Sequence, residues 1–146
     1  MTDLKYLAAP AVAYAVSSIL KLGYRLLIRR EERSFRHLVW ICTYGDGAPS
    51  THAAVLACAV TIIGITQGIG PLFYLAFTVA MVFGYEISEK REKQIRFETY
   101  LKKSSDPAMQ EIAKEGTLMD MSGHNLFEIT VGTVVGIITG IGIMAF

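Results

Sequence analysis

AAVLACAVTIIGITQGIGPLFYLAFTVAMVFGY, residues 53–85, is a long stretch without a charged side chain. As a single helix it would be about 50 Å long, well beyond the roughly 30 Å of a bilayer's hydrocarbon core. The chain must therefore turn within this stretch. The turn is expected at 68–71, Gly-Ile-Gly-Pro, because glycine ends helices and proline opens them. The stretch predicts two membrane spans, about 53–69 and 71–87.

Two further segments are apolar enough to cross a bilayer. Segment 6–28 has cations only near one end, and segment 126–146 has a single charge, Glu128. The whole chain is 52% hydrophobic and 18% charged, with a mean hydropathy of +0.40. A soluble domain of 146 residues could not bury four apolar helices on every side. The sequence predicts one all-α integral membrane domain, a bundle of about four transmembrane helices, with the short segment 35–44 at the membrane interface.

The cations predict how the bundle is oriented. Of 14 Lys and Arg residues, 13 lie in the blocks 21–36 and 90–114, and the turn at 68–71 has none. By the positive-inside rule, both blocks face the cytoplasm. The polar connection 88–122, which we expect to be partly helical, lies on the same side. An active site would therefore be cytoplasmic, because every polar segment large enough to hold one is on that face.

Net charge and cysteine content argue against a nucleic-acid partner and against a cysteine metal site. The formal net charge is only +1, and glutamates interleave the basic blocks. We therefore expect no nucleic-acid partner, and contact of these blocks with lipid headgroups is the simpler interpretation. Cys42 and Cys58 lack the spacing of metal ligands, so two free thiols are expected.

Lys21, Arg25 and Arg29 form one basic stripe on the first predicted span, since residues four apart share a helix face. Cations at a helix end often anchor it by reaching the headgroups, and this explanation serves for Arg29. Lys21 lies deeper, so we expect it to face a partner or a hydrated cavity. Lys21 and Arg25 are candidates for binding a phosphate.

A second feature that could bind phosphate lies at the start of the predicted span 53–69. Its helix start is Gly47-Ala48-Pro49-Ser50-Thr51-His52, in which proline suits the first turn and small residues leave backbone N–H groups exposed. Ser50 and Thr51 are therefore candidate phosphate ligands. The alternative is an ordinary helix start capped by a hydroxyl group. His52 favours the first interpretation, because a histidine at the membrane edge can donate a proton near neutral pH.

The last predicted span begins with a second histidine. His124 and Glu128 are four residues apart, so on a helix they would share a face, where the carboxylate orients the imidazole. Continuing by fours gives the glycine stripe, defined as Gly132, Gly136 and Gly140, which predicts a close helix-packing face. The His–Glu pair should therefore lie inside the bundle. A purely structural pair is the alternative.

Taken together, these features favour phosphoryl transfer through a histidine nucleophile. Three motifs also resemble a known family. They are Gly47-Ala48-Pro49-Ser50-Thr51-His52, then Tyr85-Glu86 followed by Arg91, and finally Gly123-His124 with Glu128 and Gly132. In order and spacing they resemble the divergent branch of the type-2 phosphatidic acid phosphatases, related to acid phosphatases and vanadium-dependent haloperoxidases. The resemblance extends from Lys21 to about Gly140.

The resemblance implies a role for each matching residue. It implies that His124 is the nucleophile, that Glu128 is its acid partner, and that His52 protonates the leaving group. It also implies phosphate binding by Lys21 and Arg91, with Ser50 in the Pro-Ser-x-His motif. No cofactor is required by this chemistry.

Extra acid distinguishes this sequence from the family pattern. Asp46 interrupts the glycine pair, and Glu86 stands where the divergent branch prefers Asp. Acid near a phosphate is unfavourable unless a cation compensates. Asp46, Glu86 and Asp120 are therefore candidate ligands for Mg²⁺.

The sequence predicts a membrane-embedded phosphatase that hydrolyses a lipid phosphate monoester or a polyprenyl diphosphate at the cytoplasmic face. The alternative is a catalytically silent membrane protein that binds lipid headgroups or assembles through the glycine stripe. Lys21 and His124 together favour the enzyme, because a scaffold needs neither at depth. The expected partner is a membrane lipid substrate, and the stripe would also allow a homo-oligomer.

Overall fold

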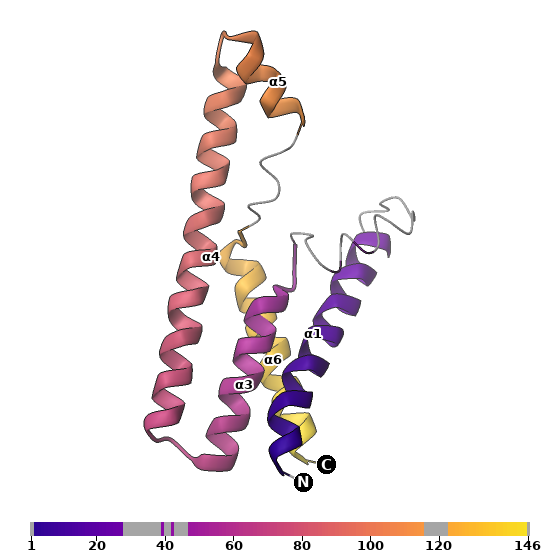
Figure 1. Cartoon of the computed structure of the whole chain (residues 1–146). Coiled ribbons are helices and arrows are strands. Elements are labelled where there is room, and N and C mark those ends of the chain that lie inside the picture. The colour runs from indigo at the N-terminus through magenta and orange to yellow at the C-terminus, as the bar shows by residue number, and fades with distance from the viewer. Residues whose placement is uncertain (1, 28–38, 40–41, 43–46, 116–122, 146) are drawn as a thin grey trace.

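The computed structural model describes residues 2–27, 39, 42, 47–115 and 123–145 of the chain. Within these residues the protein is helical, without β-strands (Figure 1). The helices are α1 (Thr2–Leu27), α3 (Thr51–Gln67), α4 (Pro71–Lys103), α5 (Pro107–Glu115) and α6 (Leu126–Ala145). The all-helical prediction is confirmed for this part of the chain. The predicted interfacial segment 35–44 lies outside the described residues except for Val39 and Cys42.

In the part of the chain that the structure describes, three helices are long and apolar enough to cross a membrane. They are α1 over Tyr6–Leu27, α4 and α6. Helix α3 is equally apolar but has 17 residues, a length of about 25 Å. The structure therefore supports three of the four expected spans by length and composition.

The turn between α3 and α4 lies where the sequence predicts it. Gly68 ends α3 with a φ of 74°, a left-handed conformation that favours glycine, and its N–H donates to the Gly64 carbonyl at 3.1 Å. Pro71 is the first residue of α4. Helix α4 then continues without interruption to Lys103, so the helix expected within 88–122 is an extension of the third predicted span.

The core is formed by α1, α3 and α6, while α4 packs chiefly against α3. Figure 1 shows α3 between α4 and α1, with α6 behind it and the two termini close together at one end. The glycine stripe explains why α3 and α6 approach so closely. A Cβ atom at Gly132 would meet the Ser50 carbonyl oxygen, and one at Gly136 would meet that of Ala54. The predicted packing face is confirmed, and its partner is α3.

The buried face of α1 has the same four-residue spacing. Ala9, Ala13 and Ser17 are fully buried, and the next members of the series are Lys21 and Arg25, exposed by only 2% and 7%. Small residues bring this face close to the other helices, and the two cations extend the same face toward the charged end. Lys21 is thus buried, in agreement with the expectation that it faces a partner or a hydrated cavity and not the lipid. The spacing of Ala9, Ala13 and Ser17 is a further signal for this burial, which sequence reasoning missed.

Candidate functional site

The candidate site lies where the first turns of α3 and α6 meet. The Ser50 N–H donates to the Glu128 carbonyl at 2.9 Å, which joins the two helix starts. The His124 N–H donates to the Ile87 carbonyl of α4 at 3.3 Å, which joins the same point to the middle of α4. Backbone hydrogen bonds therefore fix the positions from which the site's side chains project.

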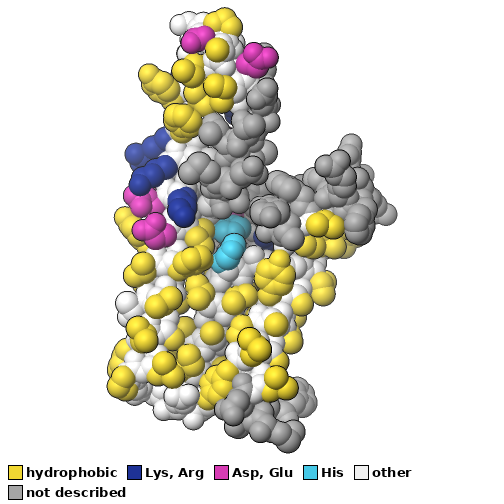
Figure 2. Space-filling model, in the orientation of Figure 1, with side chains coloured by type: hydrophobic (Ala, Val, Ile, Leu, Met, Phe, Trp, Pro, Cys, Tyr) yellow, Lys and Arg dark blue, Asp and Glu magenta, His cyan; other side chains and the backbone are white. Residues whose placement is uncertain are grey.

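The structure brings the two predicted histidines together. The ring centroids of His52 and His124 are 6.3 Å apart, although 72 positions separate them in the sequence. His124 is 4% exposed, whereas His52 is open to the surroundings. The part of α4 from Glu86 to Lys103, here called the charged extension of α4, carries the charged side chains of that helix. Figure 2 shows the histidine side chains at the boundary between the apolar part of the surface and this extension. One ring is thus held rigidly and the other can reach a bound molecule.

Glu128 orients the His124 ring. The His124 Nδ1 atom lies 2.9 Å from Glu128 Oε2. A carboxylate only accepts hydrogen bonds, so Nδ1 carries the proton and the lone pair of the neutral ring is on Nε2. The predicted His–Glu pair is therefore present, and Nε2 is the nitrogen of the neutral His124 ring that carries the lone pair.

The local geometry of this pair differs from the prediction. His124 precedes α6, which begins at Leu126, so the two residues do not share a helix face. Instead, Asn125 Oδ1 accepts from the Glu128 N–H at 2.9 Å, and Glu128 Oε2 accepts from the Asn125 N–H at 3.2 Å. This reciprocal arrangement is a capping box. Glu128 meets His124 because a carboxylate at this position of the first turn reaches back past the helix start.

Cations approach the histidines from two helices. Lys21 of α1 is close enough to His52 for their charges to interact, and Arg91 of α4 is close enough to act on the Glu128 carboxylate. Arg25 lies on the same buried face of α1, one turn after Lys21. Among the described residues, Lys21 and Arg91 therefore bring positive charge to His52 and Glu128, which suits an anionic ligand.

Ser50 and Thr51 are both buried at the start of α3, and Ser50 caps the helix. Ser50 is fully buried, and its Oγ accepts from the Ala53 N–H at 3.4 Å as the N-cap of the helix. Thr51 is 6% exposed. The hydroxyl of Ser50 thus makes the capping interaction that the sequence offered as the alternative to phosphate binding.

Gly123 is a positioning residue that sequence reasoning quoted only as part of a motif. A Cβ atom there would meet the backbone of Ile87 and Arg91, so only glycine lets the chain before His124 lie against α4. Asn125 was missed altogether. The Asn-x-x-Glu spacing of Asn125 and Glu128 is a capping-box signal and could have identified it.

The predicted Mg²⁺ ligands are not brought together by the described residues. Glu86 is exposed on α4, while Asp46 and Asp120 lie outside the described part of the chain. Within residues 2–27, 39, 42, 47–115 and 123–145, no group of three or more His, Cys, Asp or Glu side chains could hold a metal ion. Cys42 and Cys58 are free thiols, as expected.

Comparison with known protein families shows which family the chain belongs to. The sequence pattern described as the divergent PAP2 family matches residues 2–139. The chain belongs to the divergent PAP2 family. The match includes both histidines, Glu128 and the cations of α1 and α4, so the resemblance noted for three motifs extends over nearly the whole of this PAP2-family chain. Neither a curated protein nor a solved structure is significantly similar to it.

Proposed function

We propose that this member of the divergent PAP2 family is a membrane-embedded phosphatase for a lipid phosphate monoester or a polyprenyl diphosphate. The observation that supports this most directly is the histidine pair. The rings of His52 and His124 are 6.3 Å apart, and the Glu128 carboxylate occupies Nδ1 of His124 at 2.9 Å. In this proposal, His124 is the oriented nucleophile and His52 is the nearby proton donor for the leaving group.

In the first step of the proposed reaction, His124 Nε2 attacks phosphorus. A P–N bond forms while the P–O bond to the lipid breaks, and His52 gives its proton to the departing oxygen. Glu128 stabilises the positive charge that develops on the His124 ring. In the second step, a water molecule gives a proton to His52 and attacks the phosphohistidine. The P–N bond breaks, its electron pair returns to Nε2, and phosphate leaves.

The charged oxygens of the transferring group need fixed positive partners. Lys21, Arg25 and Arg91 are the proposed partners, together with backbone N–H groups at the start of α3 near Ser50 and Thr51. Lys21 and Arg25 are almost fully buried, and a charge in such surroundings interacts more strongly than one in water. Preorganised charge of this kind is the main catalytic contribution in phosphoryl transfer.

The membrane placement belongs to the same proposal. We propose that α3 spans together with α1, α4 and α6, which would make four spans with the site and the charged extension of α4 on the cytoplasmic side. The site lies at the end of the bundle where α4 continues beyond the other helices (Figure 1). A substrate with its headgroup at this level and its chain in the bilayer would present its phosphate to the histidines.

Phosphate release from purified protein tests the proposal. The screen offers several lipid phosphates and a polyprenyl diphosphate, with and without Mg²⁺. His124→Ala should abolish both turnover and the phosphoenzyme. His52→Ala should slow hydrolysis of lipid phosphates far more than that of an activated aryl phosphate, whose oxygen departs without a proton. Glu128→Gln should retain partial activity, because it keeps a hydrogen-bond partner and loses the charge.

A catalytically silent, headgroup-binding protein is the second candidate. It is favoured by the fact that Ser50 and Glu128 complete ordinary helix caps, which accounts for both without chemistry. Full activity of His124→Ala, or no phosphate release from any substrate, would leave this candidate ahead. Assembly through the glycine stripe is not retained, because α3 occupies that face of α6.

A further inference from the structure

An apolar groove runs along the membrane-spanning part of the protein between α3, α4 and α6. Its volume is about 840 Å³, within the range of small-molecule binding pockets, which is about 300–1,000 Å³. The walls are aliphatic and aromatic over most of their length, and the glutamates Glu89 and Glu92 occur only at the end near the charged extension of α4. The groove exists because α4 packs against α3 and stands away from α6.

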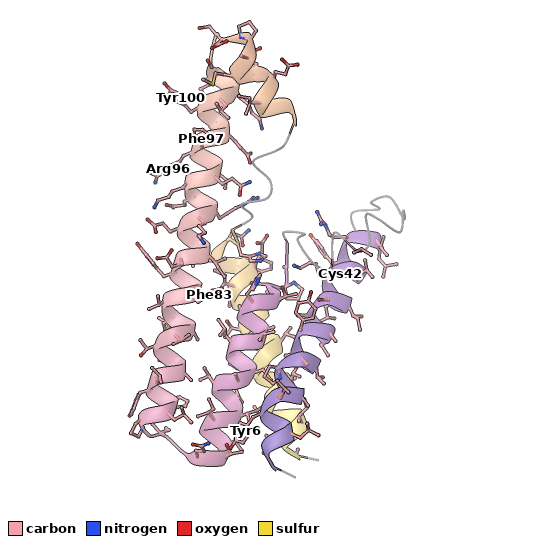
Figure 3. The ribbon with its side chains drawn as sticks, viewed as in Figure 1. Tyr6, Cys42, Phe83, Arg96, Phe97 and Tyr100 are labelled. Carbon is pink, nitrogen blue, oxygen red and sulfur yellow. The ribbon has the colours of Figure 1, made fainter. Side chains whose placement is uncertain are left out.

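The groove begins at the candidate site. Phe83 of α4 lines it, and the Phe83 ring centroid is 5.9 Å from that of His52. Ile87, whose carbonyl accepts the His124 N–H, lines it as well, and so does Leu126 at the start of α6. Figure 3 shows Phe83 on α4 at the level where α3 begins. A molecule whose phosphate lies at the histidines would therefore have its remaining part in the groove.

The length of the groove suits a hydrocarbon chain. The apolar part of its lining on α4 extends from Phe73 to Ile87, about 21 Å along the helix axis. This is more than half of the about 30 Å hydrocarbon thickness, so a chain that starts at the headgroup level is covered over the depth of its leaflet.

Small side chains open the middle of the groove and aromatic ones close its far end. Ala57 of α3 and Ala80 of α4 line the open part. At the far end the Phe73 ring lies so close to Gly64 that a Cβ atom there would be 3.2 Å from it, and Phe73 stacks on Phe77 at 6.1 Å. A larger side chain at Ala57 or Ala80 would therefore fill part of the groove, and Phe73 and Phe77 line its far end.

We propose that this groove binds the hydrocarbon chain of the substrate lipid, and that Ala57 and Ala80 determine whether the chain fits. The inference rests on the proposed function and specifies where the substrate lies. Continuity with the histidine pair favours the substrate's own chain over a helix from a second copy. A helix is about 10 Å wide with its side chains, and one seated between α4 and α6 would cover the end of the groove at Phe83, next to His52.

Filling the groove tests the proposal. Ala80→Phe and Ala57→Phe should each lower kcat/KM for a long-chain phosphatidic acid, relative to a water-soluble aryl phosphate, by about tenfold or more. Ala11→Phe is the matched control, because Ala11 is exposed on the outer face of α1. In Ala11→Phe, the ratio of kcat/KM for the phosphatidic acid to kcat/KM for the aryl phosphate should equal that of the parent protein. Circular dichroism establishes that the variants fold, and an unchanged ratio in folded Ala80→Phe and Ala57→Phe would overturn the proposal.

A labelling experiment on the parent protein needs neither a variant nor turnover. A phosphatidic acid with a photoreactive group on its acyl chain should label peptides of α3 and α4 that line the groove. A phosphatidylcholine with the same chain should label them much less, because its headgroup does not suit the cationic site. Equal labelling by both lipids would identify a bystander lipid and reject the proposal. Absence of phosphate release with selective labelling would instead count against the phosphatase and retain the groove.

Discussion

The close packing of α3 on α6 predicts that a single added methyl group at Gly136 lowers the stability of the protein. Gly136→Ala adds a single methyl group on the buried face of α6. That methyl would meet the Ala54 carbonyl oxygen, and the Ala54 carbonyl carbon and Cα lie at 2.9 and 3.0 Å from its ideal position. These atoms are backbone, so a side-chain rotation cannot relieve the overlap. The two helices must move apart.

The expected cost in stability comes from this overlap and from the separation that relieves it. Forcing an extra methyl group into a well-packed interior costs about 1–3 kcal/mol. Helices in a membrane are held together by close packing and not by exclusion of water, so separation weakens the packing along the whole stripe. The matched control is Gly142→Ala, where a Cβ atom meets nothing within 4 Å. It should leave stability unchanged or raise it by up to about 1 kcal/mol, the helix propensity of alanine over glycine.

The measurement is unfolding in mixed micelles by increasing the fraction of a denaturing detergent, followed by circular dichroism. Gly136→Ala should unfold at a clearly lower fraction than the parent, and Gly142→Ala should unfold at the same fraction or a higher one. Coincident curves for the two variants would refute the close packing of α3 on α6. The placement of His124 inside the bundle would then lose its support.

Three further predictions concern the site and its orientation. Gly123→Ala should lower turnover about a hundredfold while leaving the helices intact, because the added methyl group meets the α4 backbone and displaces His124. Turnover near that of the parent would contradict the positioning role of Gly123. Asn125→Ala should cost about 0.5–2 kcal/mol of stability and reduce turnover. Asn125→Ser should retain both the stability and the turnover of the parent, because serine caps a helix equally well. An Asn125→Ser variant as impaired as Asn125→Ala would argue against the capping box. A thiol reagent that cannot cross membranes should label Ser105→Cys only from the cytoplasmic side and Ile69→Cys only from the opposite side. In each case the labelling is measured relative to that of the parent protein, which has its own cysteines. The reverse pattern would place the site on the opposite side of the membrane.

Features that depend on neighbouring residues could be predicted from the sequence. The uncharged stretch 53–85 exceeds the bilayer thickness, which requires a turn, and Gly68 and Pro71 have the conformational preferences that place it. The four-residue spacing of the glycine stripe identifies a close-packing face, because residues four apart share a side of any helix. The depth of Lys21 in an apolar segment likewise indicates an interior position, since a charge exposed to lipid is costly.

Other features depend on which helices meet, and the sequence contains no signal for them. Lipid is as apolar as the side chains, so hydrophobicity does not distinguish a helix face that contacts another helix from one that contacts lipid. Only the tertiary structure pairs the glycine stripe with α3, leaves α4 standing away from α6, and so creates the groove beside Phe83. It also brings the ring centroid of His124 within 6.3 Å of that of His52. Residue types and spacing determined the candidate groups, and the packing of α3 against α6 and α4 decided that they form one site with room for a chain.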